Sequence, residues 1–112
     1  MNDLTQKRCL PCEGGIKPLA KEQIAGMLEQ IKGWEIDEKQ QLIFRQFNFQ
    51  SYAKVILFVN SVAWMAEQES HHPDLAVGYN KCRVSDSTHA IGGLSENDFI
   101  CASKVNALWK DS

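Results

Sequence analysis

The sequence has no long hydrophobic run, because its unbroken apolar stretches do not exceed five residues, as at 55–59. A helix needs about 20 apolar residues to cross a bilayer, so we expect no membrane-spanning segment. An excess of positive charge is also missing, since 12 basic and 14 acidic side chains give a formal net charge of -2. Such a chain has no general attraction for phosphate backbones or anionic membranes, and we expect neither nucleic acid nor a membrane as a partner.

No apolar segment follows the basic pair Lys7 and Arg8, so we expect no secretory signal. We expect a cytoplasmic location instead. In that compartment the four cysteines should be thiols. We interpret Cys82 and Cys101 as small buried hydrophobic residues. Cys9 and Cys12 have the CxxC spacing of zinc ligands or of a redox pair, but no second pair and no thioredoxin-like βαβ pattern accompanies them. The alternative is that they belong to a structurally unimportant arm.

The length of 112 residues suits one domain, and 44% hydrophobic with 23% charged residues is a globular composition. Residues 1–18 contain two glycines and two prolines but no hydrophobic period. We therefore expect a flexible N-terminal arm over 1–18 and a folded domain over 19–112.

Hydrophobic periodicity predicts helices over 19–32, 51–69 and 95–109. Gly33 can end the first helix in a left-handed conformation, and Ser95 with Asp98 predicts an N-cap for the last. Segments rich in aromatic and β-branched residues predict hairpins from strands 34–36 with 42–49 and 76–79 with 82–89. The predicted fold is α+β, of order αββαββα, with a four-stranded antiparallel sheet and three helices packed on one face.

The long helix over 51–69 is apolar around more of its circumference than one sheet can cover. We predict that its core side consists of Tyr52, Val55, Ile56, Val59, Val62, Ala63 and Ala66. Four further apolar residues lie mostly off that stripe, and a partner subunit could cover them: Leu57, Phe58, Trp64 and Met65.

Three histidines are the main candidates for chemistry: His71 and His72 after the long helix, and His89 at the end of the fourth predicted strand. Histidine titrates near neutral pH and suits proton transfer, although exposed histidines can simply be polar surface. A zinc site is disfavoured, because adjacent His71 and His72 cannot form the i, i+4 pair of a helical zinc motif. We therefore expect no metal.

Strand parity places Ser87 and His89 on one face of the fourth strand, with Asp86 and Thr88 on the other. A serine nucleophile is not expected for Ser87, since no GxSxG turn is present. Glu67 precedes His71 by four residues, so its carboxylate can approach that imidazole if the helix persists to its end.

The spacing of these residues resembles the signature of the pterin-4a-carbinolamine dehydratases. The matching pattern is Glu67, three residues, His71-His72-Pro73, five residues, Tyr79, nine residues, His89, eight residues and Asp98. Segments 33–34, 43–47, 79–81, 87–89 and 93–98 are also similar to the family, so the resemblance covers about residues 19–109. It implies the fold already predicted, assembled as a homodimer or homotetramer.

The resemblance implies a hydro-lyase, a 4a-hydroxytetrahydrobiopterin dehydratase that needs no cofactor. It would release water from a 4a-hydroxytetrahydropterin and give the quinonoid dihydropterin, which is recycled for an aromatic amino acid hydroxylase. His71 and His89 would share the general acid and base roles, and His72 would position the substrate or assist departure of the hydroxyl group. Glu67 and Asp98 would orient the histidines. The implied substrate-binding residues are Ser70, His71, His72, Ser87, Thr88, His89 and Ala90.

Three positions depart from the family pattern: Ser70 replaces a common acidic residue, Leu75 a common aromatic one, and Asp86 a residue that is usually apolar. A carboxyl group on the helix-facing side of the sheet would need a partner or exposure at an assembly edge, so Asp86 should affect assembly more than chemistry. Two other functions stay open. The chain could be a non-catalytic dimerisation or protein-interaction module, or its pterin could belong to molybdenum cofactor metabolism.

Overall fold

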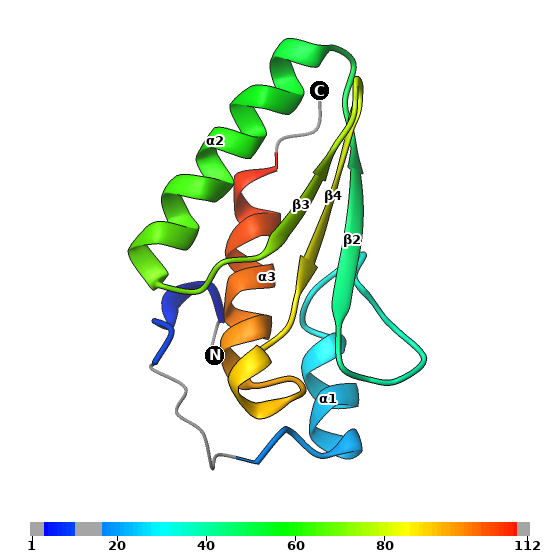
Figure 1. Cartoon of the computed structure of the whole chain (residues 1–112), viewed down its shortest axis with the longest axis vertical. Helices are drawn as coiled ribbons and strands as arrows, with labels where there is room; N and C mark the ends of the chain where they lie inside the picture. Colours follow the sequence, from blue (N-terminus) through cyan, green and yellow to red (C-terminus); the bar gives the residue numbers. More distant parts are fainter. Residues whose placement is uncertain (1–3, 11–16, 110–112) are drawn as a thin grey trace.

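The computed structural model describes residues 4–10 and 17–109 of the chain. Helices lie against a four-stranded antiparallel sheet (Figure 1). The elements in chain order are η1 (Leu4–Gln6), α1 (Lys21–Leu28), β1 (Glu35–Ile36), β2 (Ile43–Asn48), α2 (Tyr52–Glu69), β3 (Asp74–Val77), β4 (Lys81–Asp86), η2 (His89–Ile91) and α3 (Glu96–Leu108). The predicted order αββαββα is confirmed, with two short 3-10 helices added. Across the two described ranges, no helix has both the length and the apolar character that a bilayer crossing requires.

The strands are ordered β1-β2-β4-β3, so β2 and β4 occupy the centre of the sheet. Ile43 pairs with Asp86 and Phe47 pairs with Cys82. Since side chains alternate along a strand, these four residues share the face that the helices cover, and all four are buried. Strand β4 ends at Asp86, three residues before His89. His89 instead begins η2, so the prediction that it ends the fourth strand is wrong.

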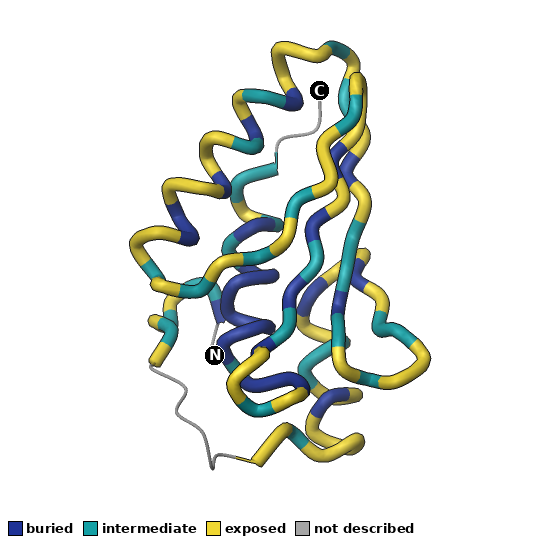
Figure 2. The backbone as a smooth tube through the Cα atoms, viewed as in Figure 1, coloured by how far each residue is buried: buried dark blue, intermediate teal, exposed yellow. Residues whose placement is uncertain are grey.

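Helix α2 begins after the N-cap Ser51, whose hydroxyl accepts a hydrogen bond from the Lys54 N–H. Its buried face consists of Val55, Phe58, Val62, Met65 and Ala66, and Figure 2 shows buried positions recurring along one side of the helix. The predicted stripe was wrong in part: Tyr52 and Ala63 are exposed, whereas Phe58 and Met65 are buried. Phe58 packs against Phe47 and Phe49, with ring centroids at 4.9 and 5.1 Å. Of the four residues predicted to lie off the stripe, Leu57 and Trp64 are exposed.

The first helix is shorter than the predicted 19–32, because regular helix runs only over Lys21–Leu28 before a series of turns. Gly33 follows with a φ of +90°, a left-handed conformation that glycine adopts without steric cost. A Cβ atom at this position would lie 2.8 Å from the guanidinium of Arg45. That guanidinium lies over the rings of Phe47 and Trp109, so Gly33 leaves room for an arginine packed on the aromatic core.

Residues 4–10, which belong to the N-terminal arm expected over 1–18, are packed against the domain. Leu4 is only 4% exposed and belongs to the main hydrophobic core. The backbone carbonyl of Thr5 accepts a hydrogen bond from Lys104, and Lys7 pairs with Glu96, both on α3. Sequence patterns missed this docking because one leucine among polar residues has no period. Residues 11–16, which include Cys12, lie outside the described residues.

Candidate functional site

The end of helix α2 determines where His71 lies. Ser70 has a φ of +54°, and its N–H donates to the carbonyls of Ala66 and Glu67. The N–H of His71 also donates to Ala66, so the chain leaves the helical path between Ser70 and His71. As a result the imidazole of His71 turns inward toward α3, and its side chain is only 11% exposed.

Asp98, in the first turn of α3, holds this imidazole. The Nε2 atom of His71 lies 2.7 Å from Oδ1 of Asp98. The other carboxylate oxygen accepts hydrogen bonds from the Thr88 hydroxyl at 2.8 Å and from the Ser95 N–H at 2.9 Å. Asp98 is fully buried and cannot swing away without losing these bonds. The arrangement therefore fixes both the carboxylate and the nitrogen to which it is bound.

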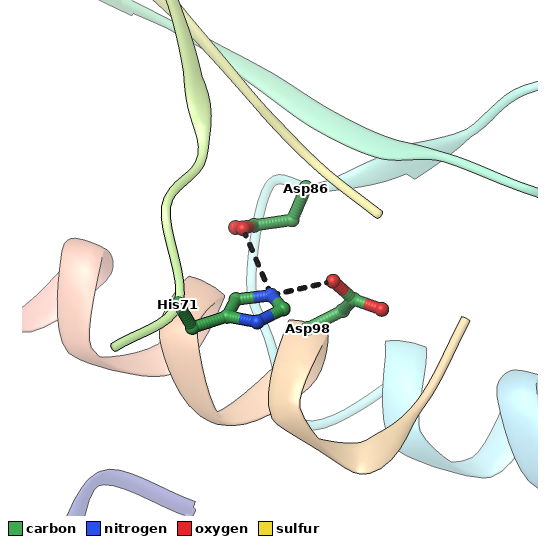
Figure 3. A group of neighbouring side chains, drawn as sticks. All are labelled: His71, Asp86 and Asp98. Carbon is green, nitrogen blue, oxygen red and sulfur yellow. Dashed lines mark hydrogen bonds and ion pairs between the residues drawn. The ribbon is translucent and has the colours of Figure 1, made fainter. Parts of the chain in front are cut away.

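Asp86 approaches the same imidazole from the sheet, with its Oδ1 atom 3.6 Å from Nε2 of His71 (Figure 3). Burial by itself would lower the pKa of His71, but the hydrogen bond to Asp98 and the charges of Asp98 and Asp86 raise it above its ordinary value. Burial and the neighbouring Asp98 raise the pKa of Asp86 to about 8. Of the two settings expected for Asp86, a partner or exposure at an assembly edge, the structure shows the first, because its carboxyl group is 1% exposed and faces His71.

The other two histidines lie at the surface. Nε2 of His72 is 3.1 Å from Oε1 of Glu67, and both side chains are largely exposed. Glu67 therefore contacts His72, and the predicted approach of Glu67 to His71 is wrong. His89 is exposed in η2, where Thr88 exchanges backbone hydrogen bonds with Gly93 across the turn. The alternation expected for the strand nevertheless continues past its end, since Asp86 and Thr88 are buried whereas His89 is exposed.

A cleft of about 610 Å³ brings the predicted substrate-binding residues together. It lies between the end of α2 and the segment that links β4 to η2. Every residue that the sequence assigned to substrate binding lines it: Ser70, His71, His72, Ser87, Thr88, His89 and Ala90. Glu67 and Asp98 do not line the cleft and contact it through the histidines that they hold. A cleft of this size is within the usual range for small-molecule sites.

One wall of the cleft comes from residues that the sequence did not indicate: Cys9, Leu10, Glu69 and Asn97. The carboxylate of Glu69 accepts a hydrogen bond from the Cys9 N–H at 2.8 Å and pairs with Arg8 and Lys104. Burial opposes ionisation of Glu69, but these contacts lower its pKa. Asn97 binds the backbone of Leu10 through both its amide oxygen and its amide nitrogen. No local pattern could have predicted a wall formed by residues almost 90 positions apart.

The geometry of the site also bears on metal binding and on thiol chemistry. His71, Asp86 and Asp98 each offer one ligand atom, and these atoms lie within 4.8 Å of one another. The spacing would admit a cation, yet the short contact between His71 and Asp98 is a hydrogen bond between two of the ligands.

Burial and the charge of Glu69 raise the pKa of the Cys9 thiol to about 12. Thiolate is the form that binds zinc or attacks a disulfide, so Cys9 is poorly suited to either role.

Residues 17–108 match the family model described as pterin 4 alpha carbinolamine dehydratase. A protein of Nitrosomonas eutropha, provisionally named a pterin-4-alpha-carbinolamine dehydratase, is 54% identical over 95% of this chain and 93% of its own length. A Legionella pneumophila protein of the same provisional name is 48% identical over 98% of each chain.

Solved structures share the fold. The crystal structure of a transcriptional coactivator/pterin dehydratase from Brucella melitensis matches with a TM-score of 0.78 and 29% identity, over 82% of this chain and 98% of that one. A pterin dehydratase-like protein identified as a RuBisCO assembly factor of the alpha-carboxysome matches with a TM-score of 0.60 and 25% identity, over 68% and 88% of the two chains.

Proposed function

Because the chain belongs to the pterin 4 alpha carbinolamine dehydratase family, we propose that it dehydrates a 4a-hydroxytetrahydropterin to the quinonoid dihydropterin. The observation that carries the proposal is the convergence of His71, His72 and His89 on one cleft of suitable size. These histidines come from two separate segments of the chain. Their shared cleft supports a common role in proton transfer.

In this mechanism His71 is the general acid. Its contact with Asp98 and its raised pKa favour the imidazolium, which has a proton to donate at neutral pH. The proton passes to the 4a-hydroxyl group, the C4a–O bond breaks, and water leaves. The N5 electron pair forms the C4a=N5 double bond, and His89 accepts the N5 proton. The atoms balance without a redox partner, metal ion or organic cofactor.

His72 and the polar residues of the cleft bind the substrate in this proposal. His72 is held by Glu67 and can contact the pterin or assist departure of the hydroxyl group. The hydroxyl of Thr88 already bonds Asp98 and Ser95, and its backbone already bonds Gly93, so backbone groups elsewhere in 87–90 are better suited to read the pyrimidine edge. Ser70, Ser87 and Ala90 complete the same rim.

The first test follows the decay of freshly generated 4a-hydroxytetrahydropterin by ultraviolet absorbance at neutral pH, with a chelator present. We expect the protein to accelerate the decay, and we expect His71→Ala and His89→Ala to reduce the rate about 100-fold or more. His72→Ala should have a smaller effect, expressed mainly in KM. Lys54→Ala, at an exposed position on α2, is the control and should leave the rate unchanged. Full activity of the two histidine variants would contradict the proposal.

A non-catalytic role is the second candidate, and the exposed apolar surface of α2 favours it. Leu57 is 66% exposed and Trp64 is 70% exposed. We propose that a second copy of the chain covers this surface in a homodimer or homotetramer. A pure interaction module would need Leu57 and Trp64 but would tolerate loss of the histidines, so the same histidine variants separate the two functions.

We also propose where the reaction takes place and what uses its product. A cytoplasmic dehydratase would return its product for reduction and reuse by an aromatic amino acid hydroxylase. A pterin of molybdenum cofactor metabolism is the alternative substrate class. Comparing pterins with different C6 substituents in the decay assay distinguishes these two settings.

A further inference from the structure

Asp86 is a buried acidic residue that the proposed reaction has not yet used. It lies on the helix-facing side of β4, opposite Ile43, and is 1% exposed. Apart from a weak contact with the Cys101 thiol, neither of its oxygens has a hydrogen-bond partner in the described parts of the chain. Burying a carboxyl group that accepts no ordinary hydrogen bond costs free energy, so its presence calls for a compensating role.

The charged and titratable groups around this carboxyl group come from three elements. Oδ1 of Asp86 lies 3.6 Å from Nε2 of His71, which belongs to the connection between α2 and β3. Asp98 and Cys101 approach from α3, and Asp74 acts on it from β3. His71 in turn has Asp98 and Asp86 as its acidic neighbours. One imidazole nitrogen therefore lies between two buried carboxyl groups, as Figure 3 shows.

We propose that Asp86 is a positioning residue that, together with Asp98, holds the ring of His71 protonated and fixes Nε2 between the two carboxyl groups. The inference rests on the proposed function, in which His71 is the proton donor. With Nε2 bound in this way, Nδ1 is the ring nitrogen that exchanges its proton with the substrate. After donation, the neutral ring keeps its Nε2–H bonded to Asp98, so the same tautomer is ready to be protonated again.

Two carboxyl groups keep His71 protonated to a higher pH than one carboxyl group would. Burial of the ring favours neutral histidine, and the hydrogen bond that Nε2–H donates to Asp98 opposes that tendency. Asp86 ionises as the pH rises toward about 8, where an ordinary histidine has already lost its proton. It then adds negative charge on the side of the His71 ring that faces the sheet. The imidazolium therefore persists to higher pH than Asp98 alone would allow. This effect costs free energy, because the Asp86 carboxyl group is buried without an ordinary hydrogen-bond donor.

The test is the titration of His71 in the full-length protein, followed by NMR of the histidine rings and assigned with His71→Gln. We expect the His71 midpoint to move to lower pH in both Asp86→Asn and Asp86→Leu. The alkaline limb of the dehydration rate should move in the same direction, and the rate at pH 8 should fall about tenfold. The control Glu38→Gln removes the same charge from an exposed turn and should move neither.

An unchanged His71 midpoint in either folded Asp86 variant would overturn the inference. It would also be overturned if the purified wild-type protein held one equivalent of a divalent metal that a chelator removes, since the cluster would then be a cation site. Asp86→Asn preserves the shape of the side chain and keeps the test available if Asp86→Leu fails to fold. The NMR midpoint needs no activity, so it separates failure of this inference from failure of the proposed dehydration.

Discussion

Asp98 links the last helix to the histidine site, because its two carboxylate oxygens serve different neighbours. One oxygen accepts from the Ser95 N–H at the start of α3, and the other binds His71. We predict that Asp98→Asn lowers the unfolding free energy by about 1–2 kcal/mol, since an amide caps the helix less well than a charged group. The same variant should lower the His71 midpoint and reduce the rate at least tenfold. Thr88→Val, which removes one donor and keeps the charge, is the matched comparison and should affect activity less.

The buried cluster also predicts how stability depends on pH. His71 and Asp86 both have raised pKa values in the folded protein, so the folded state binds more protons than the unfolded state. The stability that Asp86 contributes is complete below its unfolded pKa near 4 and is lost as pH rises toward about 8. The contribution of His71 is lost as pH rises through its raised folded pKa. We expect urea unfolding to show a fall of at least about 1 kcal/mol between pH 5 and 8. The fall should be smaller in Asp86→Leu, and a rise in stability over that interval would contradict the assignment.

The sequence indicated which histidines to consider but not which residues they contact. Glu67 and His71 are four residues apart, which would make them neighbours on a continuous helix. Helix α2 instead ends at Glu69, and the positive φ of Ser70 sends His71 inward and leaves His72 beside Glu67. A serine in a left-handed conformation leaves no periodic signal, so this exchange of partners was not predictable. Asp98 was predictable, because its place in an N-capping pattern and its place in the family signature agree.

At the scale of elements, the segment of residues 4–10 should control access to the cleft. Glu69 holds it through the Cys9 N–H, Arg8 and, indirectly, Lys104. We predict that Glu69→Ala releases this wall, raises KM several-fold and leaves kcat nearly unchanged, because no reacting group is removed. Hydrogen exchange at the Cys9 amide should increase at the same time. Glu69→Gln keeps an acceptor for that amide and should have a smaller effect, whereas equal KM values for wild type and Glu69→Ala would disprove the role of the segment.

Helix α2 shows how far periodicity can predict a face. The pattern located the helix almost to the residue, from the N-cap Ser51 to Glu69. It did not predict which part of a broad apolar surface points inward, since Phe58 is buried whereas Tyr52 is exposed. The aromatic residues Phe47 and Phe49 decide that choice, because they provide the surface on which Phe58 packs. Such a contact between elements is not encoded in the period of one of them.

At the scale of the whole molecule, the exposed surface of α2 predicts self-association. Analytical ultracentrifugation of the wild-type protein should detect a dimer or a tetramer. The double variant Leu57→Asp and Trp64→Asp should sediment as a smaller species with nearly unchanged thermal unfolding, because both side chains are exposed. Phe58→Asp should instead unfold the domain, since Phe58 is a core residue. A wild-type protein that stays monomeric at high concentration would contradict this prediction.

The docking of the N-terminal segment on α3 has a consequence for biosynthesis. Thr5 and its partner Lys104 are 99 positions apart, and Leu10 binds Asn97 across a similar distance along the chain. A ribosome that has made the sheet and all three histidines has therefore not yet supplied the helix on which the first residues pack. The cleft can acquire its last wall only when α3 emerges, so a nascent chain has its histidines before it has a complete site.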